Sequence, residues 1–173
     1  MGKCSKCGEV GHTIRRCSKD NRICIVDDDT IEKFKVIVDA CNDISTTLKK
    51  GFSEGVYEEA LCVELQLRNI QYSTQEVIPI TYKNRYIGSN RLDIILHTWC
   101  QLIIELKATS AMKNEDKWQV VRYMERKKYP YGVVINFNQS TQGKLEMCFI
   151  VCFEAKYYVY NVDTKEVTQL IDM

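Results

Sequence analysis

Three charged side chains interrupt two neighbouring apolar segments of the sequence. Asp93 lies in the first segment, and Glu105 and Lys107 lie in the second. If both segments are strands, side-chain alternation places Asp93 on one face, and Glu105 and Lys107 together on one face. A loop of residues 98–100 would set Asp93 opposite Glu105, with side chains about 4.5–5.5 Å apart. The same alternation predicts an opposite, apolar face on the first strand: Leu92, Ile94 and Leu96.

Such a pair of carboxylates has a specific chemical use. Two carboxylates directly opposite each other repel, and a divalent cation would relieve that repulsion. Carboxylates are natural ligands of Mg²⁺. A lysine one pleat further on can stabilise developing negative charge or orient a water nucleophile. The alternative interpretation is a solvated sheet face that carries an ordinary Glu–Lys pair.

A second constellation lies near the start of the chain. Four residues follow the spacing C-x2-C-x4-H-x4-C, namely Cys4, Cys7, His12 and Cys17. Three thiolates and one imidazole form a closed tetrahedral Zn²⁺ site, which is structural because no position stays open for water. A segment this small has no core, so the metal would supply its folding free energy. The alternative is a disordered tail with chance cysteines.

This head of the chain resembles the CCHC zinc knuckles of retroviral type, which bind single-stranded nucleic acid. The resemblance implies that three basic residues contact phosphates, namely Lys6, Arg15 and Arg16. Ser5 stands where such knuckles often carry an aromatic residue. Because the head contains no aromatic side chain, base stacking is unavailable. We therefore expect weak, mainly electrostatic binding, with a protein-binding knuckle as the alternative.

Composition bounds the other possibilities. The chain has 173 residues, of which 45% are hydrophobic and 10% aromatic, so it is too apolar for wholesale disorder and long enough for one core. The net charge is +1, but residues 1–23 hold six basic and two acidic groups, so a basic head precedes a mildly acidic body. No apolar run approaches the roughly 20 residues that span a bilayer, and no signal peptide opens the chain. Nine cysteines, an odd number, favour a reducing intracellular compartment, either the cytoplasm or the nucleus of a cell or a viral setting.

Periodicity divides the chain into three parts: a zinc knuckle over residues 1–20, a linker over 21–29 and a main domain over 30–173. Helical spacing predicts helices over 30–47, 53–68 and 114–127, with Asp29 or Thr30 as the first N-cap. Alternation and β-rich composition predict strands over 75–82, 86–97, 102–109, 131–137, 146–153 and 156–162. The fold class is therefore α+β or mixed α/β, and a crossover helix allows two parallel strands in one sheet.

Several motifs in the main domain share one resemblance. Gly51-Phe52-Ser53-Glu54-Gly55-Val56-Tyr57 fits the signature G-x-x-E-x-x-Y. Further matches follow in order at 91–93, 104–108, 119–123 and 132–137. Over roughly residues 35–140 the chain thus resembles the GxxExxY family of the PD-(D/E)XK nuclease-like superfamily. The resemblance implies a restriction-endonuclease-like core of αβββαβ order, although Leu92 stands where that motif often has Pro.

The resemblance also implies roles for the charged residues. Asp93 and Glu105 would hold Mg²⁺ or Mn²⁺, with the Leu106 carbonyl as a further ligand. The metal would polarise a phosphate and lower the pKa of a bound water. Lys107 would position that water or stabilise the charge on phosphorus-bound oxygens. Gln119 would contact the metal-bound water or the substrate.

One face of the second predicted helix carries candidates for a third acidic group. Glu54, Tyr57, Leu61 and Glu64 are spaced i, i+3, i+7 and i+10, which places them on one side. We expect one carboxylate to serve the metal as a further catalytic or ligand group, with Glu54 favoured over Glu64. Glu58 lies close by. Tyr123 and His97 are expected to have packing and bland polar roles.

Two functions remain open at this stage. The first is a Mg²⁺-dependent nuclease that acts on DNA, with RNA not excluded, tethered by its knuckle to single-stranded or branched nucleic acid. The second is a catalytically inactive nucleic-acid-binding or adaptor protein on the same scaffold. The presence of Asp93, Glu105 and Lys107 together favours the nuclease, because an inactive scaffold is free to lose them.

Overall fold

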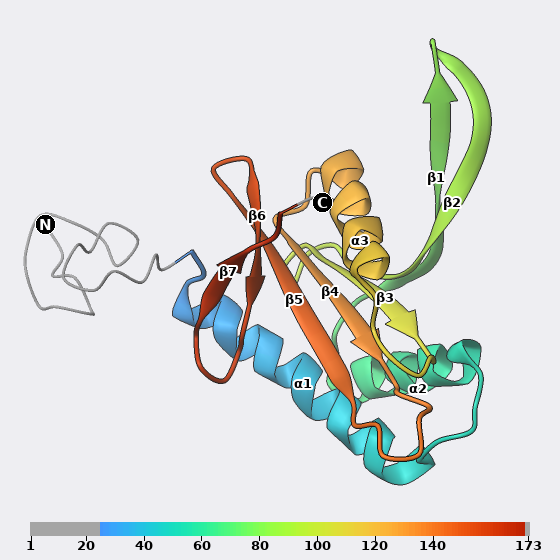
Figure 1. The fold of residues 1–173 in the computed structure, drawn as a ribbon, viewed down its shortest axis with the longest axis vertical. Helices are drawn as coiled ribbons and strands as arrows, with labels where there is room; N and C mark the ends of the chain where they lie inside the picture. The colour runs from blue at the N-terminus through green and yellow to red at the C-terminus, as the bar shows by residue number, and fades with distance from the viewer. Residues whose placement is uncertain (1–24, 172–173) are drawn as a thin grey trace, which may run out of the picture.

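The computed structural model describes residues 25–171 of the chain. Within them the chain forms three helices and one seven-stranded sheet (Figure 1). The helices are α1 (Asp28–Leu48), α2 (Glu54–Leu67) and α3 (Asn114–Lys127). The strands are β1 (Ser73–Tyr82), β2 (Arg85–Leu96), β3 (Leu102–Lys107), β4 (Tyr131–Asn136), β5 (Glu146–Phe153), β6 (Lys156–Tyr160) and β7 (Val167–Gln169).

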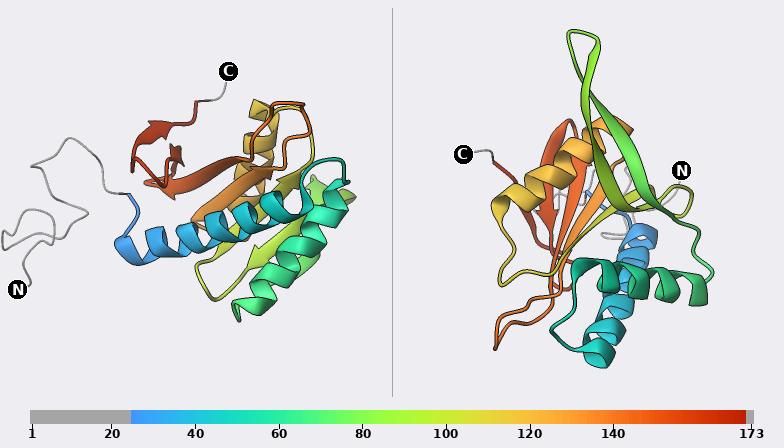
Figure 2. Two further views of the ribbon diagram at one scale, coloured as in Figure 1. Left: turned by 90° about the horizontal axis from the view of Figure 1, so that it is seen from below. Right: turned by 90° about the vertical axis from the view of Figure 1, so that its right-hand side faces the viewer.

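The strands lie in sequence order across the sheet, from β1 at one edge to β7 at the other. Neighbours are antiparallel except β3 and β4, which run parallel because α3 returns the chain between them. Helices α1 and α2 cover one face of the sheet and α3 covers the other (Figure 2). The mixed α/β class is confirmed, and the order from α2 to β4 is αβββαβ.

Helix α1 begins at Asp28 because the acidic run before it supplies a cap. The Asp27 carboxylate accepts a hydrogen bond from the Thr30 amide at 2.8 Å, and Asp28 and Asp29 fall in the first turn, where the helix dipole favours negative charge. The predicted caps, Asp29 and Thr30, are wrong by two or three residues. Ile25 and Val26 are buried in the core, so packing extends into the stretch predicted as a linker.

Two apolar clusters fill the space between the helices and the sheet. The larger one joins α1 and α2 to the sheet, with Phe34 stacked on Phe149 at 4.5 Å between ring centroids. The smaller one lies under α3. Leu92 packs in this second cluster, not with Ile94 and Leu96 as alternation predicted. Gln75 has a φ of 54°, and no pairing joins it to Asp93, so the β1–β2 ladder is interrupted beside Leu92.

The connection between β2 and β3 fixes the register that the site needs. Five residues, 97–101, separate the two strands, where the sequence predicted a loop of three. Both loop lengths give the same register, because Leu96 pairs with Leu102 and Ile94 with Ile104. The ladder ends at the pair Ile94–Ile104, and Asp93 and Glu105 are the next residues of the two strands.

Candidate active site

The three predicted residues of the acid–acid–lysine set lie together on the adjacent strands β2 and β3. The Leu106 amide donates a hydrogen bond to Asp93 Oδ2 at 2.8 Å, which fixes that carboxylate across the ladder. Lys107 Nζ donates to Glu105 Oε1 at 2.6 Å. Both acids and the lysine therefore share one site, held by adjacent strands rather than by loops.

Glu105 is the most deeply buried charged group of this site. Its side chain is 3% exposed, and its second oxygen, Oε2, is buried without a hydrogen-bond partner. Burial raises the pKa of Glu105 to about 7, and the neighbouring Asp93 carboxylate adds to the rise against the opposing effect of Lys107. The site thus concentrates negative charge that the protein's own cation does not fully compensate.

The pKa values of Asp93 and Lys107 are shifted by the same surroundings. Burial raises the pKa of Asp93, although the Leu106 amide opposes the change. Burial lowers the pKa of Lys107, but the attraction of Glu105 outweighs it, so the net pKa lies above the usual value for lysine. Lys107 therefore stays protonated, as a group that stabilises developing anionic charge must.

The donor set fits a Mg²⁺ or Mn²⁺ ion. Among residues 25–171 no group of three or more His, Cys, Asp or Glu side chains is arranged to hold a metal. Mg²⁺, however, is usually bound by one or two carboxylates and keeps several waters, and the unpartnered Glu105 Oε2 is an available ligand beside Asp93. The Leu106 amide faces Asp93, so the carbonyl of that residue leaves the strand on the same edge.

Helix α2 supplies the third carboxylate from its first residue. Glu54 interacts electrostatically with Asp93, Glu105 and Lys107. Glu58, one turn later, accepts hydrogen bonds from Gln75 at 2.8 and 2.9 Å, and burial raises its pKa.

Glu64 is not brought to this site, which corrects the prediction that it serves the metal. Its carboxylate pairs with Arg68, and Arg68 also donates to Asp43 of α1 at 2.9 Å. Glu54 and Glu64 share one side of α2 but are about three helical turns apart. Glu54 therefore lies at the site, whereas Glu64 lies near α1.

The Gly and Tyr of the G-x-x-E-x-x-Y signature anchor the segment that carries Glu54. Gly51 has a φ of 102°, which favours glycine, and its amide donates to Gln139 Oε1 at 2.7 Å. Tyr57 is fully buried, stacks on Phe137 at 4.3 Å between centroids, and donates to the Lys49 carbonyl at 2.8 Å. Gln139 also donates to the Tyr57 hydroxyl at 3.3 Å. Glu54 is therefore held between two fixed points.

Gln119 is linked to the site by its hydrogen bond to Tyr123. Gln119 Nε2 donates to the Tyr123 hydroxyl at 2.9 Å, and that hydroxyl donates to the Arg91 carbonyl at 3.3 Å. Burial raises the pKa of Tyr123, and the charges of Glu105 and Asp93 add to the rise. Tyr123 packs in the cluster under α3, as predicted, and its hydroxyl also lies close enough to the site to be affected by the charges of Glu105 and Asp93. The side-chain amide of Gln119 contacts that hydroxyl.

A polar pair missed from the sequence, buried Asn136 and half-buried Glu146, holds the chain that follows Lys107. Asn136 is fully buried at the end of β4, where its side chain accepts from the Thr109 amide at 3.0 Å and donates to Glu146 at 2.6 Å. Glu146 accepts from the Met112 amide at 3.0 Å. The only signal in the sequence is an asparagine that ends an apolar strand.

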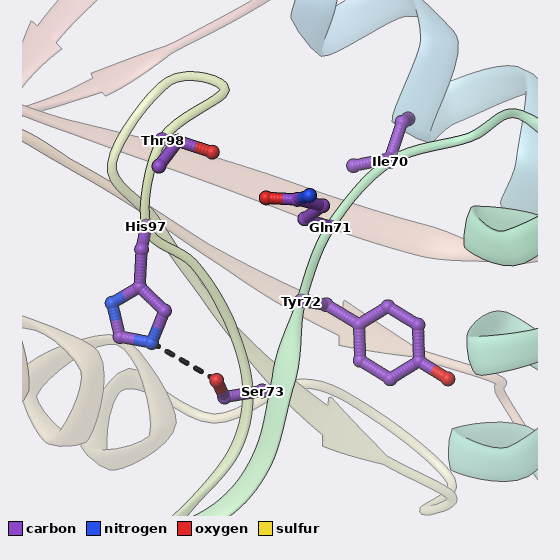
Figure 3. A pocket seen from close by; sticks show the side chains of 6 residues that line it. All are labelled: Ile70, Gln71, Tyr72, Ser73, His97 and Thr98. Atoms are coloured by element: carbon purple, nitrogen blue, oxygen red, sulfur yellow. Dashed lines mark hydrogen bonds between the residues drawn. The ribbon is translucent and has the colours of Figure 1, made fainter.

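His97 lies at a separate pocket of about 400 Å³ that begins just past the end of β2. Six residues line it: Ile70, Gln71, Tyr72, Ser73, His97 and Thr98 (Figure 3). Both ring nitrogens of His97 have partners in the fold, the Tyr129 hydroxyl at 2.7 Å and the Ser73 hydroxyl at 3.1 Å. This saturated network agrees with the bland polar role expected of His97.

The site thus combines two carboxylates and a lysine on adjacent strands of a mixed sheet. The model of the PD-(D/E)XK nuclease superfamily matches residues 32–148, more than half of the chain. The chain therefore belongs to the PD-(D/E)XK nuclease superfamily, as the sequence motifs led us to expect.

Other comparisons add little to this assignment. A solved structure titled "Crystal structure of SSO0001" is 16% identical, with a TM-score of 0.45, over 69% of this chain. The match spans 58% of that protein's length. No curated protein matches the sequence. In the described part of the chain, no helix is long and apolar enough to cross a membrane.

The predicted zinc knuckle lies outside the described residues. This applies to all of its proposed ligands and phosphate contacts: Cys4, Cys7, His12, Cys17, Lys6, Arg15 and Arg16.

Proposed function

We propose that the protein is a Mg²⁺- or Mn²⁺-dependent nuclease that hydrolyses phosphodiester bonds, with DNA as the favoured substrate. One observation carries the proposal: a buried carboxylate oxygen of Glu105 has no partner, beside Asp93 and within reach of a protonated lysine. A burial this costly is typical of functional sites rather than of stabilising ones. The superfamily assignment supports the same reaction class.

The chain's own residues have distinct parts in this mechanism. Asp93 and Glu105 would hold the divalent cation, which supplies Lewis-acid polarisation of the phosphate and a water of lowered pKa. Lys107 stays protonated and stabilises the negative charge that builds on the phosphoryl oxygens. The Leu106 amide keeps Asp93 oriented. Glu54 adds a carboxylate at the rim, where it can accept a proton or bind a water.

The proposed head extends this function. A zinc knuckle over residues 1–20 would hold single-stranded or branched nucleic acid near the site and raise its local concentration. Membership of the GxxExxY family is part of the same proposal, supported by the way Gly51 and Tyr57 frame Glu54. A catalytically inactive adaptor on this scaffold is the competing function, and it predicts no dependence on Lys107.

The decisive test is cleavage of single-stranded, duplex and branched DNA and RNA with Mg²⁺ or Mn²⁺. We expect Lys107→Ala to lower the cleavage rate by roughly 100-fold or more. Lys156→Ala, which removes an exposed lysine on β6, should leave it unchanged. Among the helix acids, Glu54→Gln should lower the rate and Glu64→Gln should not. No cleavage by the wild type, or equal rates in Lys107→Ala, would support the inactive adaptor.

A further inference from the structure

The outer part of the β1–β2 hairpin projects away from the body of the protein (Figures 1 and 2). Beyond Ile78, which is buried in the cluster under α3, most of its side chains are exposed. The last turn of α3 braces the base: Arg126 donates to the Pro79 carbonyl at 3.0 Å, and Lys127 pairs with Glu76. Core packing and the contacts with α3 explain the fixed base of the hairpin, but not its exposed outer part.

At the tip of the exposed arm, two basic side chains lie between two aromatic ones in the sequence. Tyr82 is 63% exposed and Tyr86 is 67% exposed, and Lys83 and Arg85 lie between them in the sequence. Lys83 Nζ lies 5.5 Å from the centroid of the Tyr82 ring. Exposed aromatics beside cations are the combination that binds unpaired bases and phosphates.

The charge of the arm is opposite to that of the rest of the body. Residues 77–92 contain three basic groups, Lys83, Arg85 and Arg91, and no acidic group. Residues 24–173 as a whole carry 18 basic and 21 acidic groups. The arm therefore concentrates positive charge on an otherwise acidic domain, which favours a polyanionic partner over an ordinary protein surface.

The arm also leads directly to the site. Arg91 lies two residues before Asp93 on β2, and its carbonyl accepts the hydrogen bond of Tyr123. At about 3.3 Å per residue, Arg85 at the tip lies roughly 26 Å from Asp93 along the strand. A strand of substrate in the site could thus follow the arm.

We propose that the β1–β2 hairpin is a nucleic-acid-binding arm for the single-stranded part of the substrate. Tyr82 and Tyr86 stack on unpaired bases, while Lys83 and Arg85 bind phosphates at the tip of the arm. This inference rests on the proposed function and specifies the form of the substrate. Pro79 lacks an amide donor, which is typical of an edge strand protected against pairing with another chain.

The test measures binding by full-length protein in the Lys107→Ala background, so that bound substrate is not consumed. The probes are a fluorescein-labelled 20-nucleotide single-stranded DNA, the matching RNA and a blunt 20-base-pair duplex, read by anisotropy without added Mg²⁺. We expect Tyr82→Ala with Tyr86→Ala to weaken single-strand binding about tenfold or more. Replacing both by Phe should restore binding to within about twofold, because the phenyl ring still stacks.

The charged residues have a separate readout. Lys83→Gln with Arg85→Gln should lower the slope of log affinity against log salt by about 1.4, since each single-strand phosphate contact contributes about 0.7. A matched pair of exposed lysines, Lys156→Gln with Lys165→Gln, should leave the slope unchanged. An unchanged melting temperature in each variant confirms that the arm, rather than the fold, is altered.

The outcomes separate this inference from the proposed function. If the arm variants bind the single strand as tightly as the unmodified arm does, the inference is overturned, while the nuclease proposal is decided by its own cleavage test. If the protein never cleaves but the arm variants lose single-strand binding, the arm is confirmed and the nuclease fails. If the tyrosine variants instead dissociate a dimer in sedimentation, with nucleic acid affinity unchanged, the arm binds a second copy and the inference is overturned. The DNA and RNA probes show which polymer it prefers.

Discussion

Glu105 shows how the site opposes the stability of the fold. One of its oxygens receives a hydrogen bond from Lys107, while the other is buried without a partner. A buried ion pair regains its desolvation cost only when the remaining lone pairs are satisfied. Here burial outweighs the lysine, and the pKa of Glu105 rises to about 7. The unsatisfied oxygen is therefore a cost to the folded protein, and cation binding would remove it.

The raised pKa of Glu105 predicts how the free energy of unfolding depends on pH. The pKa of Glu105 is about 7 in the folded protein against 4.5 ordinarily, so the folded state binds the proton more tightly than the unfolded state. The resulting contribution, about 3 kcal/mol, is fully present below pH 4.5 and is lost as the pH rises through 7. In Glu105→Gln, which mimics the protonated form, unfolding in urea without Mg²⁺ should show a smaller loss of stability between pH 5 and 8.

Mg²⁺ gives the matching control. Because the cation binds only the folded site, it should raise the wild-type free energy of unfolding at pH 8 and have little effect on Glu105→Gln. If the stability of Glu105→Gln depended on pH and on Mg²⁺ as that of the wild type does, both the raised pKa of Glu105 and the proposed metal site would be contradicted.

At this scale, the sequence could identify residues that break a local pattern. Asp93, Glu105 and Lys107 are charges within apolar strands, so alternation alone could bring them together. Tyr123 could not be found in this way, because its role depends on a hydrogen bond to Arg91, which is 32 positions away in the chain. Glu64 matched the stripe of Glu54, but only the packing of α2 on α1 decided that it pairs with Arg68.

Between elements, α3 packs directly on β4 at Gly132. A Cβ atom on Gly132 would lie 2.3 Å from Val120 Cγ1 and 2.8 Å from Met124 Sδ. Glycine at this position lets the helix lie directly on the sheet, which in turn sets where Tyr123 meets the Arg91 carbonyl.

Gly132→Ala should therefore destabilise the protein by about 1–3 kcal/mol, because the rigid Val120 side chain cannot move aside. Gly88→Ala is the matched control, since a Cβ there has nothing within 4 Å, and its effect should stay within about 0.5 kcal/mol. Urea unfolding of the two variants measures the difference. Equal stabilities would show that α3 has room to shift and that its distance from β4 is not fixed by Gly132.

Most elements of this fold are local enough to be predicted. The three helices and six of the strands follow from periodicity, and the parity of the β2–β3 loop fixed the register of the site. Strand β7 was missed, because its three residues, Val167–Gln169, are too few to show a pattern. The side on which Leu92 packs was also wrong, because it depends on the interruption at Gln75, and a glutamine with positive φ has no signature in sequence.

At the scale of the whole molecule, charge divides the chain into parts with separate tasks. The superfamily match covers residues 32–148 and leaves the basic head outside it. The outer hairpin, residues 77–92, holds three basic groups and no acidic one, and the first 23 residues hold six basic and two acidic groups. A near-neutral total thus combines an acidic body with two basic regions, each of which would attract a polyanion.

The head makes the last prediction, which concerns zinc. Because a knuckle folds only around its metal, the full chain should hold one equivalent of zinc, measured by elemental analysis after purification. Cys17→Ser removes one of four ligands and should lose most of that zinc. Cys152→Ser, at a half-buried position of β5, is the matched control and should retain it. The main thermal transition should be alike in wild type and Cys17→Ser, because the body has its own core. If Cys17→Ser held as much zinc as Cys152→Ser, the knuckle would be rejected. The hairpin would then be the remaining basic region with a proposed nucleic-acid-binding role.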